Sequence, residues 1–150
     1  MLTPLLLILA LVASGVGAGV LTAVAISVFP ALCTMPPARY VETHRMMGKG
    51  FHPTMPIVFN IGMLAAFGAA ALIGWPQAWL PLLAGLALAG SQAVSHLGNV
   101  PINRMLTGIE PGMVPADWQD PRPRWRRLNW LRTALALLGL LLLSVTAVAA

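Results

Sequence analysis

The chain has few charged residues and hardly any acidic ones. Of its 150 residues, 9% are charged and 58% are hydrophobic, and only four are Asp or Glu. A soluble domain usually carries about 25% charged residues. This scarcity excludes a water-soluble fold, because too little polar surface is available to cover one. The composition indicates an integral membrane protein with a single domain, residues 1–150.

Cysteine is almost absent as well, and the basic residues are confined to a few places. The single cysteine, Cys33, excludes an internal disulfide and any CxxC redox pair. The nine Lys and Arg residues give a net charge of +5, and they lie in two short segments between apolar runs. Such placement is typical of anchoring at a lipid surface. We therefore expect the lipid bilayer as a partner and no nucleic acid.

Long apolar runs dominate the rest of the chain. A helix needs roughly 20 apolar residues to cross the bilayer. Four runs meet this length, at about residues 4–29, 54–74, 79–103 and 128–149. The sequence therefore predicts an all-α membrane protein, a bundle of four transmembrane helices.

The connecting segments predict the orientation of this bundle. The expected loops 35–53 and 104–127 carry most of the basic residues, whereas the loop "GWPQAWLP" between the second and third spans carries no charge. Basic loops remain in the cytoplasm. Both termini are then expected on the outer side of a bacterial inner (plasma) membrane.

Small and aromatic residues fit the same picture. Small residues at a spacing of four let helix backbones approach closely in a membrane, and three such pairs are Gly15 and Gly19, Gly62 and Ala66, and Ser91 and Ser95. Tryptophans gather at membrane interfaces. We expect Trp75 and Trp79 at the outer interface and Trp118, Trp125 and Trp130 at the inner one.

A row of polar side chains interrupts the third span. Gln92, His96, Asn99 and Asn103 follow one another at i, i+4, i+7 and i+11, so an α-helix would place them on one face. Lipid cannot satisfy these groups, and the face must point into the bundle or a wet cavity. Pro101 removes one helical N–H beside them.

The depth of this row suggests access from the cytoplasm. His96 lies eight residues before Arg104, roughly 12 Å along a helix from the cytoplasmic end. Two interpretations remain open. The row is either the polar wall of a pocket or a set of hydrogen bonds between helices around a proline kink.

A second polar cluster precedes the second span. It comprises Tyr40, Glu42, His44, Arg45 and His52. Gly48 and Gly50, followed by Pro53, are expected to interrupt the helix here and to turn His52 toward the bundle.

The three histidines of the chain, His44, His52 and His96, raise the question of a metal. Imidazoles beside a carboxylate suit Fe, Cu or Zn with an open coordination position. The spacing, however, matches neither HxxxH nor HxH. The expected cofactor is therefore either none or a single Fe or Cu ion.

A third cluster opens the fourth span. Asn129 and Arg132 lie one helical turn apart, and Arg132 falls inside the apolar run. One interpretation is an interfacial anchor that extends to the lipid headgroups. The other is an inward role, in which Arg132 pairs with Glu42 or with an anionic ligand.

Four stretches together carry a resemblance to a known family. They are "VFPAL" at 28–32, "MMGKGFHPTMP" at 46–56, "NVPINRML" at 99–106, and the series Trp118, Trp125, Asn129, Arg132. In this order the chain resembles the anthrone-oxygenase-like family of small four-helix membrane proteins. The resemblance implies a membrane-embedded oxidase, which in fungal polyketide members oxygenates an anthrone carbon to an anthraquinone. The chain departs from the bacterial pattern at His44, Met47 and His52, where Gln and Asn are usual.

Two functions are compatible with these features. The first is an anthrone-oxygenase-like oxidoreductase, a monooxygenase that acts on an aromatic, lipid-soluble substrate in a cytoplasm-facing pocket. His96 would be its base, and Asn99 and Asn103 would stabilise the enolate oxygen. The substrate-binding residues would be Gln92, Asn129, Arg132 and Glu42. The alternative is a non-catalytic membrane protein that binds a lipid, a quinone, a metal or a partner subunit. A homo-oligomer is compatible with either.

Overall fold

The computed structural model describes residues 2–110 and 112–149, and within these ranges the regular secondary structure is helical throughout. Four helical segments are long and apolar enough to cross a membrane. They are Leu2–Cys33, Thr54–Ile73, Trp79–Thr107 and Arg122–Ala149. The prediction of an all-α bundle with four membrane helices is confirmed.

Two of these segments contain a short π-helical turn. The elements in chain order are α1 (Leu2–Ala23), η1 (Val24–Val28), α2 (Phe29–Cys33), α3 (Pro37–Phe51), α4 (Thr54–Ile73), α5 (Trp79–Val94), η2 (Ser95–Asn99), α6 (Val100–Thr107) and α7 (Arg122–Ala149). The first span is thus α1–η1–α2, and the third is α5–η2–α6.

The two π turns follow the same local plan. The amide of Phe29 bonds to the carbonyl of Val24, and the amide of Val100 bonds to the carbonyl of Ser95, each five residues back. In both spans a proline comes next, as the second residue of α2 or α6. Proline has no N–H for the α-helical ladder. The extra residue of the π turn and the missing bond of the proline thus loosen both spans over neighbouring turns.

The connecting segment 35–53 contains the helix α3. Pro37 opens α3, where a missing N–H costs nothing. The helix runs through Gly48 and Gly50 to Phe51, and the glycines do not interrupt it. One face of α3 is buried and carries Tyr40 and His44, and tertiary contacts therefore hold the helix together despite its glycines.

The other polar segment is also more helical than expected. α6 continues past 103 to Thr107, and α7 begins at Arg122 rather than at 128. The carboxylate of Asp120 accepts a hydrogen bond from the backbone N–H of Arg122 at 3.0 Å. A helix satisfies its own backbone whether its side chains are polar or apolar. The apolar run therefore marks the membrane and not the ends of the helix.

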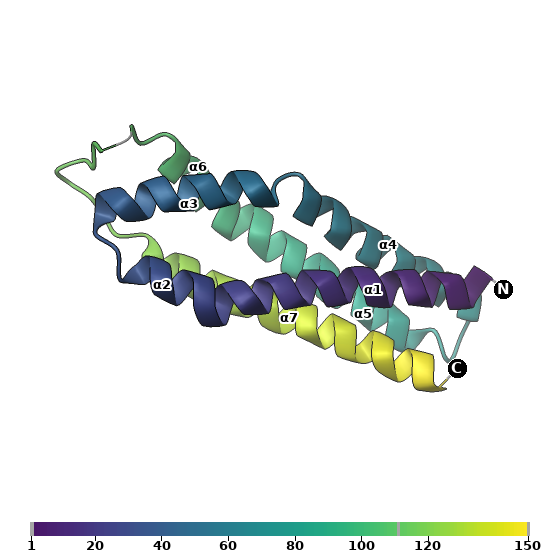
Figure 1. Ribbon diagram of the computed structural model, residues 1–150. Helices are drawn as coiled ribbons and strands as arrows, with labels where there is room; N and C mark the ends of the chain where they lie inside the picture. Colours follow the sequence, from purple (N-terminus) through teal and green to yellow (C-terminus); the bar gives the residue numbers. More distant parts are fainter. Residues whose placement is uncertain (1, 111, 150) are drawn as a thin grey trace.

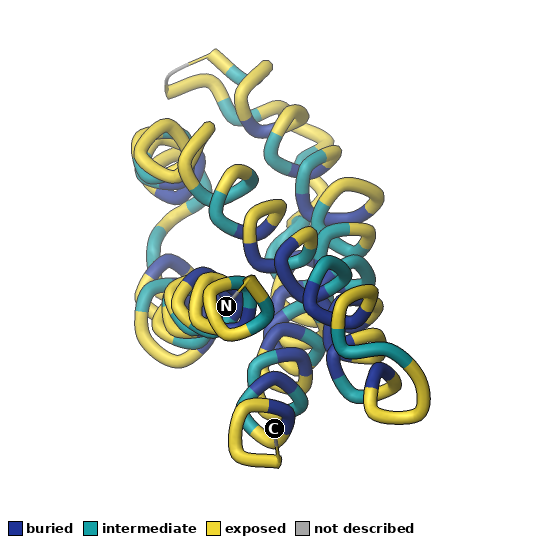
Figure 2. The backbone as a smooth tube through the Cα atoms, turned by 90° about the vertical axis from the view of Figure 1, so that its right-hand side faces the viewer, coloured by how far each residue is buried: buried dark blue, intermediate teal, exposed yellow. Residues whose placement is uncertain are grey.

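The spans form a closed ring. α1 packs against α4 and α7, and α5 packs against the same two helices. Figure 1 shows that the start of α1 and the end of α7 lie at one end of the bundle, and that α3 and α6 lie at the other. In Figure 2, viewed from the side of the chain ends, buried residues line the inside of the ring and exposed residues cover its outside. We call the end with α3 and α6 the basic end.

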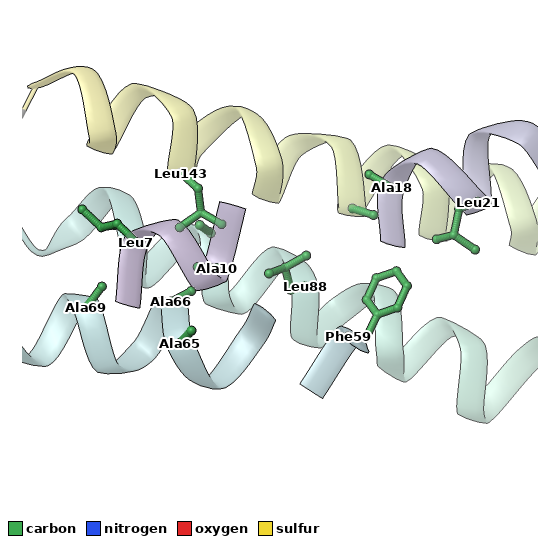
Figure 3. Close-up of a cluster of buried hydrophobic side chains, with 12 residues drawn as sticks. Leu7, Ala10, Ala18, Leu21, Phe59, Ala65, Ala66, Ala69, Leu88 and Leu143 are labelled. Atoms are coloured by element: carbon green, nitrogen blue, oxygen red, sulfur yellow. The ribbon is translucent and has the colours of Figure 1, made fainter. Parts of the chain in front are cut away.

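Small side chains bring the helices together in the other half of the bundle. Leu7, Ala66, Leu88 and Leu143, one from each span, belong to one buried cluster (Figure 3). A Cβ atom at Gly62 would lie only 3.3 Å from the backbone nitrogen of Ser14. The predicted packing role of Gly62 and Ala66, both buried, is therefore confirmed.

The predicted role of Gly15 and Gly19 is wrong. A Cβ atom at either position would meet nothing within 4 Å. Gly17 faces the interior instead, and a Cβ there would lie 2.8 Å from the ring of Phe59. A spacing of four can mark a packing face, but Gly15 and Gly19 lie on a face of α1 that does not turn inward, whereas Gly17 lies on the face that does.

A substitution at Gly62 tests this close approach. We expect Gly62→Leu to lower the free energy of unfolding by about 1–3 kcal/mol, because the new side chain overfills the contact between α1 and α4. The matched variant Gly19→Leu places the same side chain in open space and should change stability by less than about 0.5 kcal/mol. Thermal unfolding in detergent, followed by tryptophan fluorescence, measures both. Equal destabilisation by the two variants would contradict the packing described here.

Candidate functional site

A cavity of about 200 Å³ lies inside the basic end of the bundle. Both π turns border it, η1 through Val24 and Val28 and η2 through Ser95 and His96. The side chains that line it are mostly apolar. Its polar lining consists of His44, His52, Gln92, Ser95, His96, Asn103, Trp125 and Arg132.

The cavity collects most of the polar residues that the sequence pointed to. Six of the nine candidates lie on its wall, and they are His44, His52, Gln92, His96, Asn103 and Arg132. They come from α3, the α3–α4 connection, α5, η2, α6 and α7. The other three candidates, Glu42, Asn99 and Asn129, lie outside this lining.

The amide of Asn103 has a defined orientation. Its Oδ1 accepts a hydrogen bond from Nε1 of Trp125 at 2.8 Å and lies 3.0 Å from Nε2 of His44. An indole N–H can only donate, so the atom that faces it must be the amide oxygen. The amide nitrogen of Asn103 bonds to none of the described residues. Its N–H groups therefore remain for a ligand of the cavity.

This arrangement also determines the tautomer of His44. Because Asn103 Oδ1 is an acceptor, Nε2 of His44 must carry the proton. Its Nδ1 then holds a lone pair, is buried, and has no partner among the described residues. Burial lowers the pKa of His44 below 6.5, the hydrogen bond to Asn103 opposes this shift, and the charge of Arg132 adds to it. His44 is therefore a neutral residue that positions Asn103.

Arg132 reaches the cavity from α7, and Asn129 holds it there. Oδ1 of Asn129 accepts from Nε of Arg132 at 3.1 Å and from Nη2 at 2.8 Å. Oγ of Ser95 accepts from Nη1 at 3.3 Å. Asn129 is fully buried and contacts the cavity only through Arg132. The inward interpretation of Arg132 agrees with this geometry.

Gln92 and His96 differ in how they are held. Nε2 of Gln92 donates to Oδ1 of Asn60 on α4 at 2.7 Å, which ties α5 to α4 at the edge of the cavity. The ring of His96 lines the cavity, is exposed, and has no hydrogen bond to any described residue. His96 is thus free to interact with a ligand.

Asn99 does not share the face of the other three polar residues, contrary to expectation. It is fully buried, and its Nδ2 donates to the backbone carbonyl of Trp125 at 3.2 Å. The spacing rule assumed a regular α-helix, whereas Asn99 closes the π turn η2, which rotates the residues around it. Its position supports a structural role between η2 and α7.

Glu42 also lies away from the cavity. It is exposed and pairs with Arg39 on the same helix at 3.2 Å. It borders a second, smaller cavity of about 170 Å³ together with Arg45 and Glu110. The expected pairing of Glu42 with Arg132 is therefore wrong, because the two residues are on different faces of the basic end.

The histidines share one cavity without forming a compact cluster. His44, His52 and His96 all contribute to its wall. Over residues 2–110 and 112–149, no three His, Cys, Asp or Glu side chains are arranged to hold a metal ion. Any ion bound here would need ligands in addition to these side chains, such as water or a substrate.

Trp125 is the important residue that sequence reasoning misjudged. It was expected in an interfacial belt, but it is buried. Its ring stacks on Phe29 of α2 at a centroid distance of 4.3 Å and meets the edge of His44 at 5.6 Å. The signal was present in the sequence, because Trp125, Asn129 and Arg132 lie at i, i+4 and i+7, on one helical face.

Tyr40 closes the cluster on the side of α3. Its hydroxyl is buried without a partner among the described residues, and burial raises the pKa of Tyr40 above its usual range. The guanidinium of Arg122 lies 5.2 Å from the centroid of its ring. Arg122 also donates to the backbone carbonyl of Met35 at 2.9 Å, which fastens the start of α7 to the start of α3.

The neutral state of His44 predicts a dependence of stability on pH. Its pKa is lower in the folded protein than in the unfolded chain, so the unfolded chain binds more protons below about pH 6.5. The free energy of unfolding should therefore have its full value above that pH. It should fall as the pH drops from there toward the pKa of His44 in the folded protein. The midpoint of thermal unfolding, measured between pH 8 and pH 5, records this loss.

The variant His44→Gln should reduce the loss, since the Gln amide can still donate to Asn103 but does not titrate. The variant His52→Gln leaves His44 intact and should show the same loss of stability at low pH as wild type. The same pH profile in wild type and His44→Gln would show that His44 is not responsible.

Comparison with known proteins agrees with these observations. The family model described as anthrone oxygenase matches residues 44–142, which include the cavity residues of α3, α4, α5, η2, α6 and α7. No curated protein and no solved structure matches the chain. The match covers more than half of the chain, and it includes three of the four stretches noted in the sequence, while "VFPAL" at 28–32 precedes it. The chain belongs to the anthrone oxygenase family.

Proposed function

We propose that the chain is an oxygenase that uses O₂ to convert an aromatic, lipid-soluble ketone of the anthrone type into a quinone. The observation that carries this proposal is the amide of Asn103. Its oxygen is occupied by Trp125 and His44, so its N–H groups are available to a ligand in a largely apolar cavity. Membership of the anthrone oxygenase family supports the same reaction.

The first step is removal of a proton. The CH₂ group of an anthrone is acidic because the resulting negative charge spreads onto the carbonyl oxygen. His96, exposed in the cavity, is the base that takes this proton. The N–H of Asn103 donates to the oxygen that becomes negative. A donor fixed in advance inside an apolar site is more effective than a mobile one in water.

The second step uses O₂. The carbanion forms a carbon–oxygen bond to O₂ and gives a hydroperoxide after protonation. Loss of the remaining C–H proton then breaks the oxygen–oxygen bond, so that the carbon becomes a carbonyl and the other oxygen leaves as water. One oxygen atom enters the product, the substrate supplies all the electrons, and no further reductant is needed.

The position of the cavity suits such a substrate. It lies at the basic end of the bundle, which the positive-inside rule places in the cytoplasm of a bacterial cell, with both termini outside. Its lining includes the apolar residues Val20, Val24 and Met55, from α1, η1 and α4. Such a lining suits a lipid-soluble compound from the inner leaflet.

Two substitutions test the chemistry. We expect His96→Gln to lower the rate of anthrone oxidation by about 10²-fold or more, because the base is lost. We expect Asn103→Asp to lower it by about 10²–10³-fold, because the donor is lost. The aspartate still offers an oxygen to Trp125 and His44, so the fold should survive. O₂ uptake by protein in nanodiscs measures the rate, and ¹⁸O₂ should label one oxygen atom of the product.

The control is Met105→Ala, an exposed position on α6 outside the cavity lining, and its rate should equal that of wild type. The content of Fe and Cu is measured in the same samples, because a redox metal bound in the cavity would supply another means of activating O₂. Ligand binding without O₂ uptake in wild type would contradict the proposal and favour a non-catalytic binding protein.

A further inference from the structure

Arg132 is a half-buried cation without a counterion among the described residues. The chain has four acidic residues, at positions 42, 110, 117 and 120, and all of them lie outside the four spans. Asp120 pairs with Arg122 at 2.8 Å, and Glu42 pairs with Arg39. Within the described part of the chain, Arg132 forms no ion pair. Charges inside membrane proteins are normally paired or hydrated, and this cation is therefore available to pair with an anion from outside the chain.

The geometry shows where such an anion would bind. The neutral oxygens of Asn129 and Ser95 occupy Nε and one N–H on each terminal nitrogen of Arg132. One N–H on each terminal nitrogen remains, and each can donate to a charged oxygen. The guanidinium lines the cavity, with its carbon 5.3 Å from the ring centroid of Trp125. It is therefore held in place and aimed at ligand space.

The surroundings restrict the ligand further. Aromatic rings are prominent in the cavity wall, and they belong to Phe29, Phe51, Phe59 and Trp125. A cavity of about 200 Å³ with such walls suits a compact, flat ring system better than a flexible acyl chain. The fatty acid or the lipid headgroup remains the other source of an anionic oxygen, and the experiment below separates it from an aromatic anion.

We propose that the cavity binds an aromatic ligand as its anion, with the ionised oxygen on the guanidinium of Arg132. This inference rests on the proposed function only in taking the cavity as the ligand site. It narrows the substrate class to aromatic compounds that carry a carboxylate, phenolate or enolate oxygen. It also gives Arg132 a role distinct from that of Asn103, because a full positive charge holds an oxygen that is already ionised.

Binding of matched probes tests this inference. The probes are 2-naphthoate, which is ionised at neutral pH, its neutral isostere 2-naphthamide, and oleate as an acyl anion. Dissociation constants are measured by calorimetry with wild-type protein in phosphatidylcholine nanodiscs. We expect naphthoate to bind at least about tenfold more tightly than naphthamide, because ion pairs shielded from water contribute at least this much. Oleate should bind more weakly than naphthoate.

Variants assign the preference to Arg132. Arg132→Gln should bind the two naphthalene probes equally. Arg132→Lys should retain part of the preference for naphthoate, because it keeps the charge but loses the several donors of the planar guanidinium. Arg127→Gln removes an exposed arginine outside the cavity and should behave as wild type. If Arg132→Gln does not fold, the dissociation constants of naphthoate and naphthamide are compared between wild type and Arg132→Lys. A smaller preference for naphthoate in Arg132→Lys then supports the inference, and an unchanged preference contradicts it.

Three results would overturn the inference. They are equal binding of naphthoate and naphthamide by wild type, a preference that persists in Arg132→Gln, and oleate that binds more tightly than naphthoate and displaces it. The last result would assign the anion to a lipid. Because binding is measured without turnover, absent O₂ uptake would count against the proposed function alone, and absent selectivity would count against this inference alone.

Discussion

The hydrogen bond from the indole of Trp125 to Asn103 is the interaction on which the site depends. It fixes the amide of Asn103 and thereby the tautomer of His44. The same indole stacks on Phe29 and lies beneath the guanidinium of Arg132, so one side chain connects α2, α3, α6 and α7. In a bundle surrounded by lipid, water is not at hand to replace such a bond. Loss of the indole N–H would therefore free the amide of Asn103 and remove the constraint on His44.

The two halves of the bundle differ in how closely their helices pack. In the half near the chain ends, alanines and glycines such as Ala66 and Gly62 allow close backbone contact, because packing and not the hydrophobic effect holds helices together in lipid. At the basic end both loosened spans, each with a π turn followed by a proline, border the cavity. The tight half thus provides a rigid support for a half that is open enough to accept a ligand.

Within the cavity, Arg132 is charged whereas His44 is neutral. Arg132 carries a positive charge. Burial lowers the pKa of His44, and the charge of Arg132 adds to this shift. An imidazole that stays neutral beside a cation can position an amide without competing for an anionic oxygen. The arrangement as a whole favours ligands that become, or already are, negatively charged at one oxygen, which agrees with both the proposed reaction and the proposed role of Arg132.

The sequence by itself determined the membrane class, the number of spans and most of the polar residues that line the cavity. These follow from run length and from the rule that polar groups inside a membrane must face the interior. Only the tertiary structure decided which faces turn inward. Gly17, and not Gly19, lies in the core. Asn99 lies outside the cavity because a π turn shifts its register. Trp125 lies at the centre of the site and not at the membrane interface. Helical spacing shows which residues share a face, but the neighbouring helices decide where that face points.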